Sequence, residues 1–156
     1  MKITNLLINR LLSDVDHMQV NILPAGLQKI IDSGFYCFDN LITFNFIKLD
    51  SKDMNLEVIK ERFYDLSGFE YSHNKIHIED YCDGNLLLNA LLFLNEFEKK
   101  WQHDMICGKP FIIIGFEPET EFGQICTFTF HKQRVGESVV NIDNLEKFSN
   151  AVLINL

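Results

Sequence analysis

The chain has 156 residues, of which 14 are Lys or Arg and 22 are Asp or Glu, so its formal net charge is −8 at pH 7. Apolar residues make up 47% and charged residues 23%, a globular balance that excludes a disordered chain, a collagen-like fibre and a charged interaction tail. The length predicts a single domain over residues 1–156, because roughly 100–150 residues is the commonest domain size. The 14 Phe residues predict an aromatic core.

The first part of the chain carries short apolar patterns, one with the period of a helix and one with the period of a strand. Helical spacing covers residues 3–11, and alternation over 18–22 predicts a short strand that ends at Pro24. Apolar positions within 27–31 predict a helix that Gly34 ends, since glycine accepts the left-handed conformation that follows many helices.

Residues 41–49 (LITFNFIKL) alternate between apolar and polar side chains over their first half. Thr43 and Asn45 share one face. The apolar side chains of the other face are Ile42, Phe44 and Phe46. This period of two predicts a strand with one buried face.

The next segment predicts a helix and then a hairpin. Asp53 is a candidate N-cap for a helix with an apolar stripe over 56–66, which Gly68 ends. Residues 69–80 predict a β-hairpin with a polar turn near 73–74.

Residues 85–103 predict the main helix, with Asp83 as its N-cap. Its first half is apolar nearly all round, so we expect it to be covered on more than one side. In its second half, Phe97 and Trp101 face inward. If Leu91 is buried as this pattern predicts, Leu91→Ala costs about 2–5 kcal/mol.

Two further strands are predicted by their patterns. Residues 111–116 (FIIIGF) form a continuous apolar run that suits a central strand, and 125–134 alternate strictly. The core face of the second strand carries Cys126, Phe128 and Phe130, and the face predicted to be solvated carries Thr127, Thr129 and His131. Antiparallel sheets with one wet face show this alternation.

The C-terminal segment predicts a turn at 135–137 and a strand at 138–142. Asp143 and Glu146 stand at capping-box spacing before a short helix through about residue 150. Because strands come in hairpins rather than in regular βαβ units, we expect an α+β fold, with a mainly antiparallel sheet packed against a long central helix and shorter helices.

Targeting signals and disulfides are not expected. The N-terminal segment lacks the apolar core of a signal peptide, and the longest apolar run, 86–94, is far shorter than the about 18 residues of a membrane span. A cytoplasmic protein is therefore expected. Its four cysteines, predicted to be free thiols, are Cys37, Cys82, Cys107 and Cys126.

Two His-containing pairs invite a metal interpretation. On a strand, His73 and His77 would lie about 13 Å apart, too far to bind one ion, so surface histidines are expected. His103 and Cys107 lack a second ligand pair and are a weak zinc signal. No metal and no cofactor are predicted.

No motif for covalent catalysis is present. The acidic neighbours of Cys82 raise a thiol pKa, which is the wrong direction for a nucleophile. Glutamates at 117, 119 and 121 would be an acid–base set only if burial tuned them. We expect a protein that is not an enzyme and has no catalytic residues.

Acidic residues gather in two clusters, predicted as partner-binding residues: Glu79, Asp80, Asp83, Glu117, Glu119 and Glu121. They disfavour nucleic-acid binding, which needs clustered Lys and Arg. One interpretation is that both clusters are only solvated loops. The other is an acidic surface that attracts a basic protein.

The last third of the chain has a long helix ending near Trp101, then GKPFIIIGFE, an acidic loop, CTFTFHKQRVGES and VVNIDNLEKFSNAVL. This order resembles the immunity proteins that bacteria encode beside contact-dependent or polymorphic toxins. The resemblance implies a small, acidic, non-enzymatic cytoplasmic protein that binds a toxin domain tightly.

We therefore expect an antitoxin that neutralises a cognate toxin domain, with a basic nuclease as the expected toxin, and that contacts neither nucleic acid nor membrane. Two alternatives stay open. One is a small metal- or thiol-dependent enzyme that uses His73, His77 or Cys82. The other is an adaptor protein with a different partner.

Overall fold

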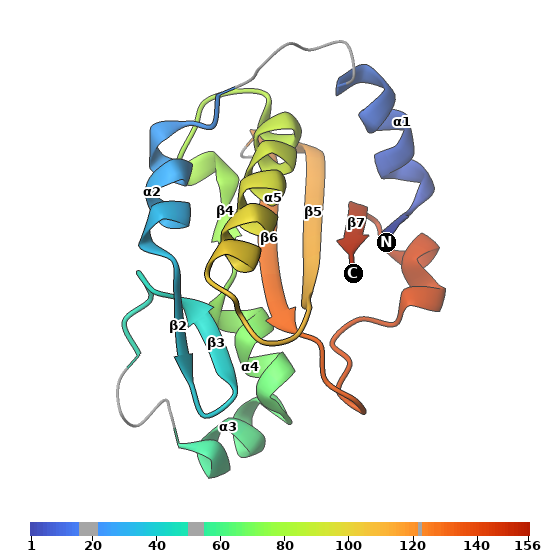
Figure 1. Cartoon of the computed structure of the whole chain (residues 1–156). Helices are drawn as coiled ribbons and strands as arrows, with labels where there is room; N and C mark the ends of the chain where they lie inside the picture. Colours follow the sequence, from blue (N-terminus) through green and yellow to red (C-terminus); the bar gives the residue numbers. More distant parts are fainter. Residues whose placement is uncertain (16–21, 50–54, 122) are drawn as a thin grey trace.

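Helices pack on antiparallel sheets in a computed structural model of the chain, which is an α+β fold as predicted (Figure 1). The structure describes residues 1–15, 22–49, 55–121 and 123–156. The helices are α1 (Leu6–Val15), α2 (Ala25–Ser33), α3 (Leu56–Phe63), α4 (Leu66–His73) and α5 (Leu86–His103), with 3-10 turns η1 (Ile78–Asp80) and η2 (Ile142–Lys147). The strands are β1 (Lys2–Thr4), β2 (Phe35–Phe38), β3 (Leu41–Phe44), β4 (Ile76–His77), β5 (Pro110–Thr120), β6 (Gly123–Lys132) and β7 (Ala151–Asn155).

The main sheet has five antiparallel strands in the order β1-β7-β5-β6-β4, and β2 and β3 form a separate hairpin. β5 lies in the centre, which confirms the central strand predicted at 111–116. Helix α5 crosses one face of this sheet, as predicted for the main helix (Figure 1). None of the helices in the described ranges is both long and apolar enough to cross a bilayer.

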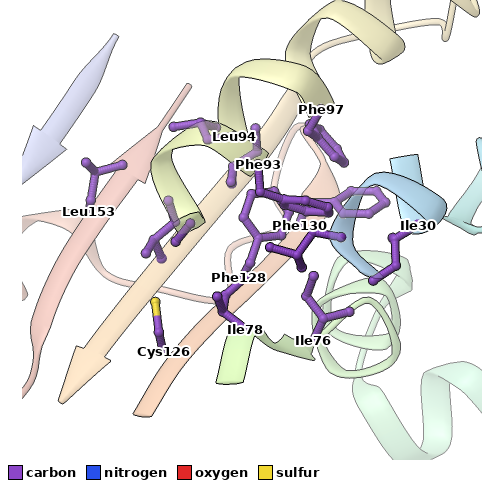
Figure 2. Packing of buried hydrophobic residues seen from close by; sticks show 14 of the residues in the cluster. Ile30, Ile76, Ile78, Phe93, Leu94, Phe97, Cys126, Phe128, Phe130 and Leu153 are labelled. Atoms are coloured by element: carbon purple, nitrogen blue, oxygen red, sulfur yellow. The ribbon is translucent and has the colours of Figure 1, made fainter. Parts of the chain in front are cut away.

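The core between α5 and the sheet is aromatic (Figure 2). Phe93 packs edge-to-face on Phe128 with ring centroids 4.8 Å apart, and Phe97 lies 4.8 Å from Phe130. All four side chains are fully buried. Burying each such side chain contributes about 1.5–3 kcal/mol by transfer, so these rings hold α5 to β6.

Trp101 closes the C-terminal end of this core. It is the only Trp in the chain, and it stacks on Phe97 with ring centroids 5.7 Å apart. Its indole Nε1 donates to the carbonyl of Gly108 at 3.0 Å, so the polar atom of this buried ring has a partner.

The start of α5 differs from the prediction. Gly84 (φ 66°) and Asn85 (φ 47°) both have left-handed backbone, and the chain enters the helix without a side-chain cap. The Asn89 side chain donates instead to the Gly84 carbonyl at 3.1 Å. Asp83 is therefore not the N-cap. Leu91 is only partly buried, so Leu91→Ala falls at the lower end of its range, about 2 kcal/mol.

The segment around β3 is a hairpin that the sequence analysis missed. Asp39 and Asn40 both have positive φ, 44° and 70°, as a two-residue turn between β2 and β3 requires. β3 ends at Phe44, and Phe46 beyond it is 41% exposed. The prediction of a strand with only one buried face is wrong, because Thr43 and every other residue of β3 are buried. Helix α4 packs against this strand.

The helix predicted over 56–66 is two helices. Tyr64 has a φ of 69°, which breaks α3, and the Asp65 side chain caps α4 by accepting from the N–H of Gly68 at 2.7 Å. Gly68 therefore lies inside a first turn rather than after a last one. Asn55 caps α3, and Asp53 lies outside the described residues.

The hairpin predicted over 69–80 is wrong because its first strand lies in α4 and its last residues form the 3-10 turn η1. Only β4, Ile76–His77, pairs with β6. α4 covers the β6 face that was predicted to be solvated: Thr129 and His131 are each 2% exposed, and Thr129 Oγ1 donates to the Tyr71 carbonyl at 2.6 Å.

The ends of the chain also differ from the prediction. Residues 138–142 form no strand, and Asn141 caps η2 by accepting from Asp143 N–H. Glu146 is not part of a capping box, because its carboxylate accepts from the Leu6 N–H of α1. β7 was not predicted, although it pairs with both β1 and β5.

Near the N-terminus, β1 precedes α1, which begins at Leu6. The strand predicted at 18–22 falls mainly on residues outside the described ranges. Gly34 ends α2 as predicted: its φ is 69°, and its N–H donates to the Ile31 carbonyl at 3.0 Å.

Candidate functional site

The structure brings the two acidic clusters to one end of the main sheet. Glu119 lies near the end of β5 and Glu121 in the turn that leads to β6, and the segment between η1 and α5 carries Asp83. Both segments lie at the top of Figure 1. Glu79 and Asp83 line a hollow of about 260 Å³ together with Gln124 of β6. We call this region, with Glu79, Asp80, Asp83, Glu119 and Glu121, the acidic end.

Most of the acidic side chains at this end face solvent. Asp80, Asp83, Glu119 and Glu121 are exposed. Carboxylates gathered at one end of the sheet add to the local negative potential, which water screens only in part. The acidic end is therefore a region of negative potential that a partner with positive charge would relieve.

Glu79 is held in place rather than free. One oxygen accepts from the Cys126 N–H at 3.0 Å, and the other lies 3.0 Å from His77 Nδ1. Burial alone would raise the pKa of this carboxyl, but the hydrogen bonds from Cys126 and His77 outweigh burial, and the pKa is lowered. Glu79 therefore remains charged and also satisfies a backbone group at the edge of β6.

Glu117 does not belong to this solvated set. Its Oε1 accepts from the Asn150 side chain at 2.6 Å, and it is half-buried on the sheet face away from α5. The predicted partner-binding residue Glu117 thus differs from Glu119 and Glu121, because it is half-buried and bound to Asn150 whereas they are exposed.

The cysteines are free thiols, as predicted. Burial raises the pKa of Cys82, the carboxylates of Asp83 and Glu79 raise it further, and a hydrogen bond from Asn89 opposes them. This direction confirms the prediction for Cys82. Burial also raises the pKa of Cys126. Both groups are therefore thiols rather than thiolates at neutral pH.

The two histidines of the pair His73 and His77 lie on different elements. His73 lies on α4 and stacks on Phe69 with ring centroids 3.8 Å apart, whereas His77 lies on β4. His103 contacts Asp104. Within the described ranges, no group of three or more His, Cys, Asp or Glu side chains is placed to hold a metal ion.

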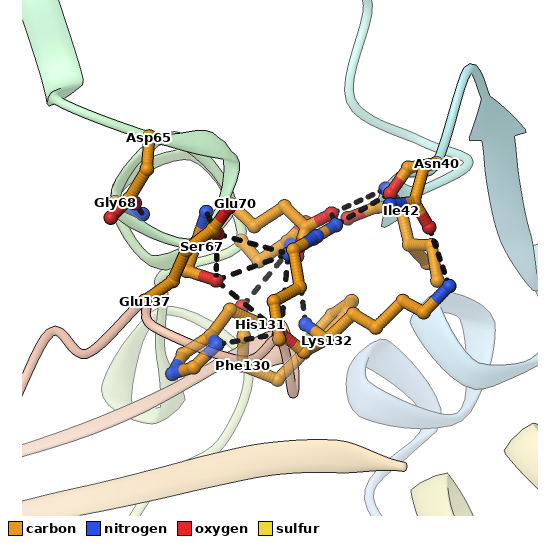
Figure 3. A network of polar contacts seen from close by, with 12 residues as sticks. Asn40, Ile42, Asp65, Ser67, Gly68, Glu70, Phe130, His131, Lys132 and Glu137 are labelled. Atoms are coloured by element: carbon orange, nitrogen blue, oxygen red, sulfur yellow. Dashed lines mark hydrogen bonds and ion pairs between the residues drawn. The ribbon is translucent and has the colours of Figure 1, made fainter. Parts of the chain in front are cut away.

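A buried polar network joins the two sheets, and the sequence analysis missed it (Figure 3). Glu70 of α4 is 0% exposed. Its carboxylate accepts from the N–H of Ile42 and of Lys132, each at 2.7 Å, and pairs with the Arg134 guanidinium at 2.6 Å. Burial raises the pKa of Glu70, while Arg134 and the two peptide groups oppose the rise.

Asn74, which directly follows α4 as its C-cap, completes this network. Its amide donates to the carbonyls of Ile42 at 2.9 Å and Phe130 at 3.3 Å, and it accepts from the Phe44 N–H at 3.1 Å. Side chains of α4 and of its C-cap thus replace backbone pairing between β3 and β6. A pattern of polar residues at helical spacing, Glu70 and Asn74, was the available signal.

Comparison with known proteins identifies a family. The chain matches the family described as Uncharacterized protein PM0498 over residues 3–155. A protein of Pasteurella multocida (strain Pm70), named Uncharacterized protein PM0498, is 34% identical over 154 residues, which cover 97% of this chain and 96% of that protein. No solved structure matches. Because the match spans nearly the whole of both chains, this protein belongs to the PM0498 family.

Proposed function

We propose that this protein is an immunity protein, which binds a cognate toxin domain through its acidic end and neutralises it. The observation that carries the proposal is the meeting of two acidic segments, distant in sequence, at one end of the sheet. A toxin that acts on nucleic acid must present basic residues to phosphate, so a basic nuclease is the partner that fits this end best.

The geometry also suits fast and selective binding. Complementary fields raise association rates by about 10- to 1000-fold at low salt. Glu79 is already fixed by its hydrogen bonds, so binding would not have to order it. We place the interaction in the cytoplasm, where an immunity protein meets a toxin that has entered the cell.

The test reverses charge at the acidic end. Glu119→Lys with Glu121→Lys should slow association with the basic toxin domain encoded beside the gene by about tenfold at low salt. The same variant should lose protection in cells that produce the toxin. Surface plasmon resonance at low and high salt and growth of co-expressing cells measure the two effects.

A matched control separates local from net charge. Glu57→Lys with Glu61→Lys makes the same change in net charge on exposed positions of α3, at the opposite end of the molecule (Figure 1). Its association rate should stay within about twofold of wild type. Equal loss in both variants, or no loss in the first, would contradict binding through the acidic end.

A further inference from the structure

A pocket of about 240 Å³ lies on the face of the main sheet away from α5. Its floor is formed by β5, β6 and β7, one wall by α4, and the other by the segment that precedes β7. The floor residues are Ile113, Gly115, Thr127 and Val152. The pocket is separate from the hollow at the acidic end, which has different lining residues.

Gly115 creates the hollow at the centre of the floor. It lies in the interior of the central strand, where glycine weakens a strand and often marks a close approach by a ligand. Its φ is outside the left-handed region, and an added Cβ would meet only Thr127 Oγ1, at 3.0 Å. The backbone conformation therefore does not require glycine, but a side chain here would press on the Thr127 hydroxyl, so its absence keeps this point of the floor open.

The lining of the pocket carries two opposite charges, Lys75 and Glu117. Lys75 lies between α4 and β4 with its ammonium 5.3 Å from the centre of the Tyr71 ring, and no described carboxylate pairs with it. Glu117 uses Oε1 to accept from Asn150, which leaves Oε2 for a ligand. The pocket therefore offers one cation and one carboxylate above a partly apolar floor.

This arrangement matches a small zwitterion with an apolar body. We propose that the pocket binds a free α-amino acid with an apolar side chain. Its carboxylate pairs with Lys75, its ammonium pairs with Glu117, and its side chain lies over Gly115 against Ile113 and Val152. The volume is below that of pockets for drug-sized molecules, about 300–1,000 Å³, and suits a ligand of this size.

The first experiment titrates the wild-type protein with leucine, N-acetyl-leucine and leucine methyl ester. Leucine should shift the amide NMR signals of Gly115, Thr127 and Val152. Each blocked ligand lacks one charge and should bind about tenfold more weakly, since a charge-assisted hydrogen bond is lost.

Protein variants then assign each charge. Glu117→Gln should remove the preference for leucine over N-acetyl-leucine, and Lys75→Gln should remove the preference over the methyl ester. Glu119→Gln makes the same change in net charge as Glu117→Gln at an exposed residue outside the pocket, so its affinities should equal those of wild type.

Filling the floor provides an independent test. Gly115→Val should abolish leucine binding and should retain the fold, because valine favours strands and the Thr127 side chain can turn away from the added Cβ. If Gly115→Val does not fold, Gly115→Ala takes its place and should weaken leucine binding about tenfold. Circular dichroism and thermal unfolding check both variants.

Three outcomes would contradict the proposal that this pocket binds an amino acid. They are no shift of the floor signals with leucine, valine, methionine or phenylalanine at millimolar concentration, equal binding of the blocked ligands, and unchanged affinity in Gly115→Val. The toxin proposal is tested by different residues. A Gly115→Val variant that loses leucine but still neutralises the toxin therefore separates the two.

Discussion

The Glu70 carboxylate is fully buried, and its three partners come from β3 and from the end of β6 or just beyond it: Ile42, Lys132 and Arg134. A buried charge is costly unless it is paired and hydrogen-bonded. Here Arg134 supplies the opposite charge, and two peptide N–H groups supply further donors. This ion pair therefore links β3 to β6, and removal of either member leaves the other buried without its main partner.

Glu70→Ala should lower the free energy of unfolding by about 3–5 kcal/mol, because it removes the 2.6 Å ion pair and leaves the buried Arg134 guanidinium with only the longer 3.9 Å contact to Glu137. Urea unfolding measures the loss. Glu61→Ala, at an exposed position of α3, is the control and should change stability by at most about 0.5 kcal/mol. A loss below about 1 kcal/mol for Glu70→Ala would contradict this account of the ion pair.

His131 makes stability depend on pH. Burial lowers its pKa from the ordinary 6.5, Arg134 lowers it further, and the Lys132 carbonyl, Asp65 and Glu137 oppose them. The folded protein therefore binds a proton less readily than the unfolded chain. Its contribution to stability is complete above pH 6.5 and is lost as the pH falls from 6.5 towards the folded pKa.

His131→Phe should flatten this part of the stability curve. The ring already stacks on Phe111 with centroids 4.7 Å apart, and its Nε2 is buried without a hydrogen bond among the described residues, so phenylalanine suits the site. Urea unfolding of both proteins at several pH values between 5 and about 8 measures the slope. An identical slope in the variant would assign the dependence to another group.

At the scale of elements, the start of α4 depends on one cap. Asp65→Ala should destabilise the protein by about 0.5–2 kcal/mol, since the N–H of Gly68 loses its acceptor. Asp83→Ala is the matched control: this aspartate precedes α5 but does not cap it, so its effect should be within about 0.5 kcal/mol. Thermal unfolding compares the two, and an equal loss would contradict the assignment.

The elements that were predicted correctly have long and strong patterns. α5 and β6 each repeat one period over many residues, and β5 is a continuous apolar run, so local sequence decides them. β7 is short, and its strand state depends on β5 and β1 beside it. The break at Tyr64 was hidden because apolar spacing continues through it.

The candidate site was predicted only in part, because local sequence does not show which distant segments lie together. Both acidic clusters are visible in the sequence, but their meeting at one end depends on β6 passing beside η1. The sequence also shows Glu117 and Glu119 as equivalent. The structure separates them, because Asn150 binds one and the other is exposed.

At the scale of the whole molecule, the acidic end and the proposed amino-acid pocket occupy different places. The acidic end lies where β5 turns into β6, whereas the pocket with Gly115 lies on the sheet face between α4 and the C-terminal segment. A partner protein and a small ligand could therefore be bound at the same time. Measurement of toxin affinity with and without leucine would show whether the two sites are coupled.

The single Trp of the chain also offers a built-in optical reporter. Trp101 is 4% exposed and lies beside Phe97 at the far end of α5 from the acidic loops. Its emission should shift to longer wavelength when the helix leaves the sheet, without any attached dye. The acidic end lies at the opposite end of α5, so the Trp101 emission should not change when a partner binds there. The emission therefore distinguishes unfolding from binding.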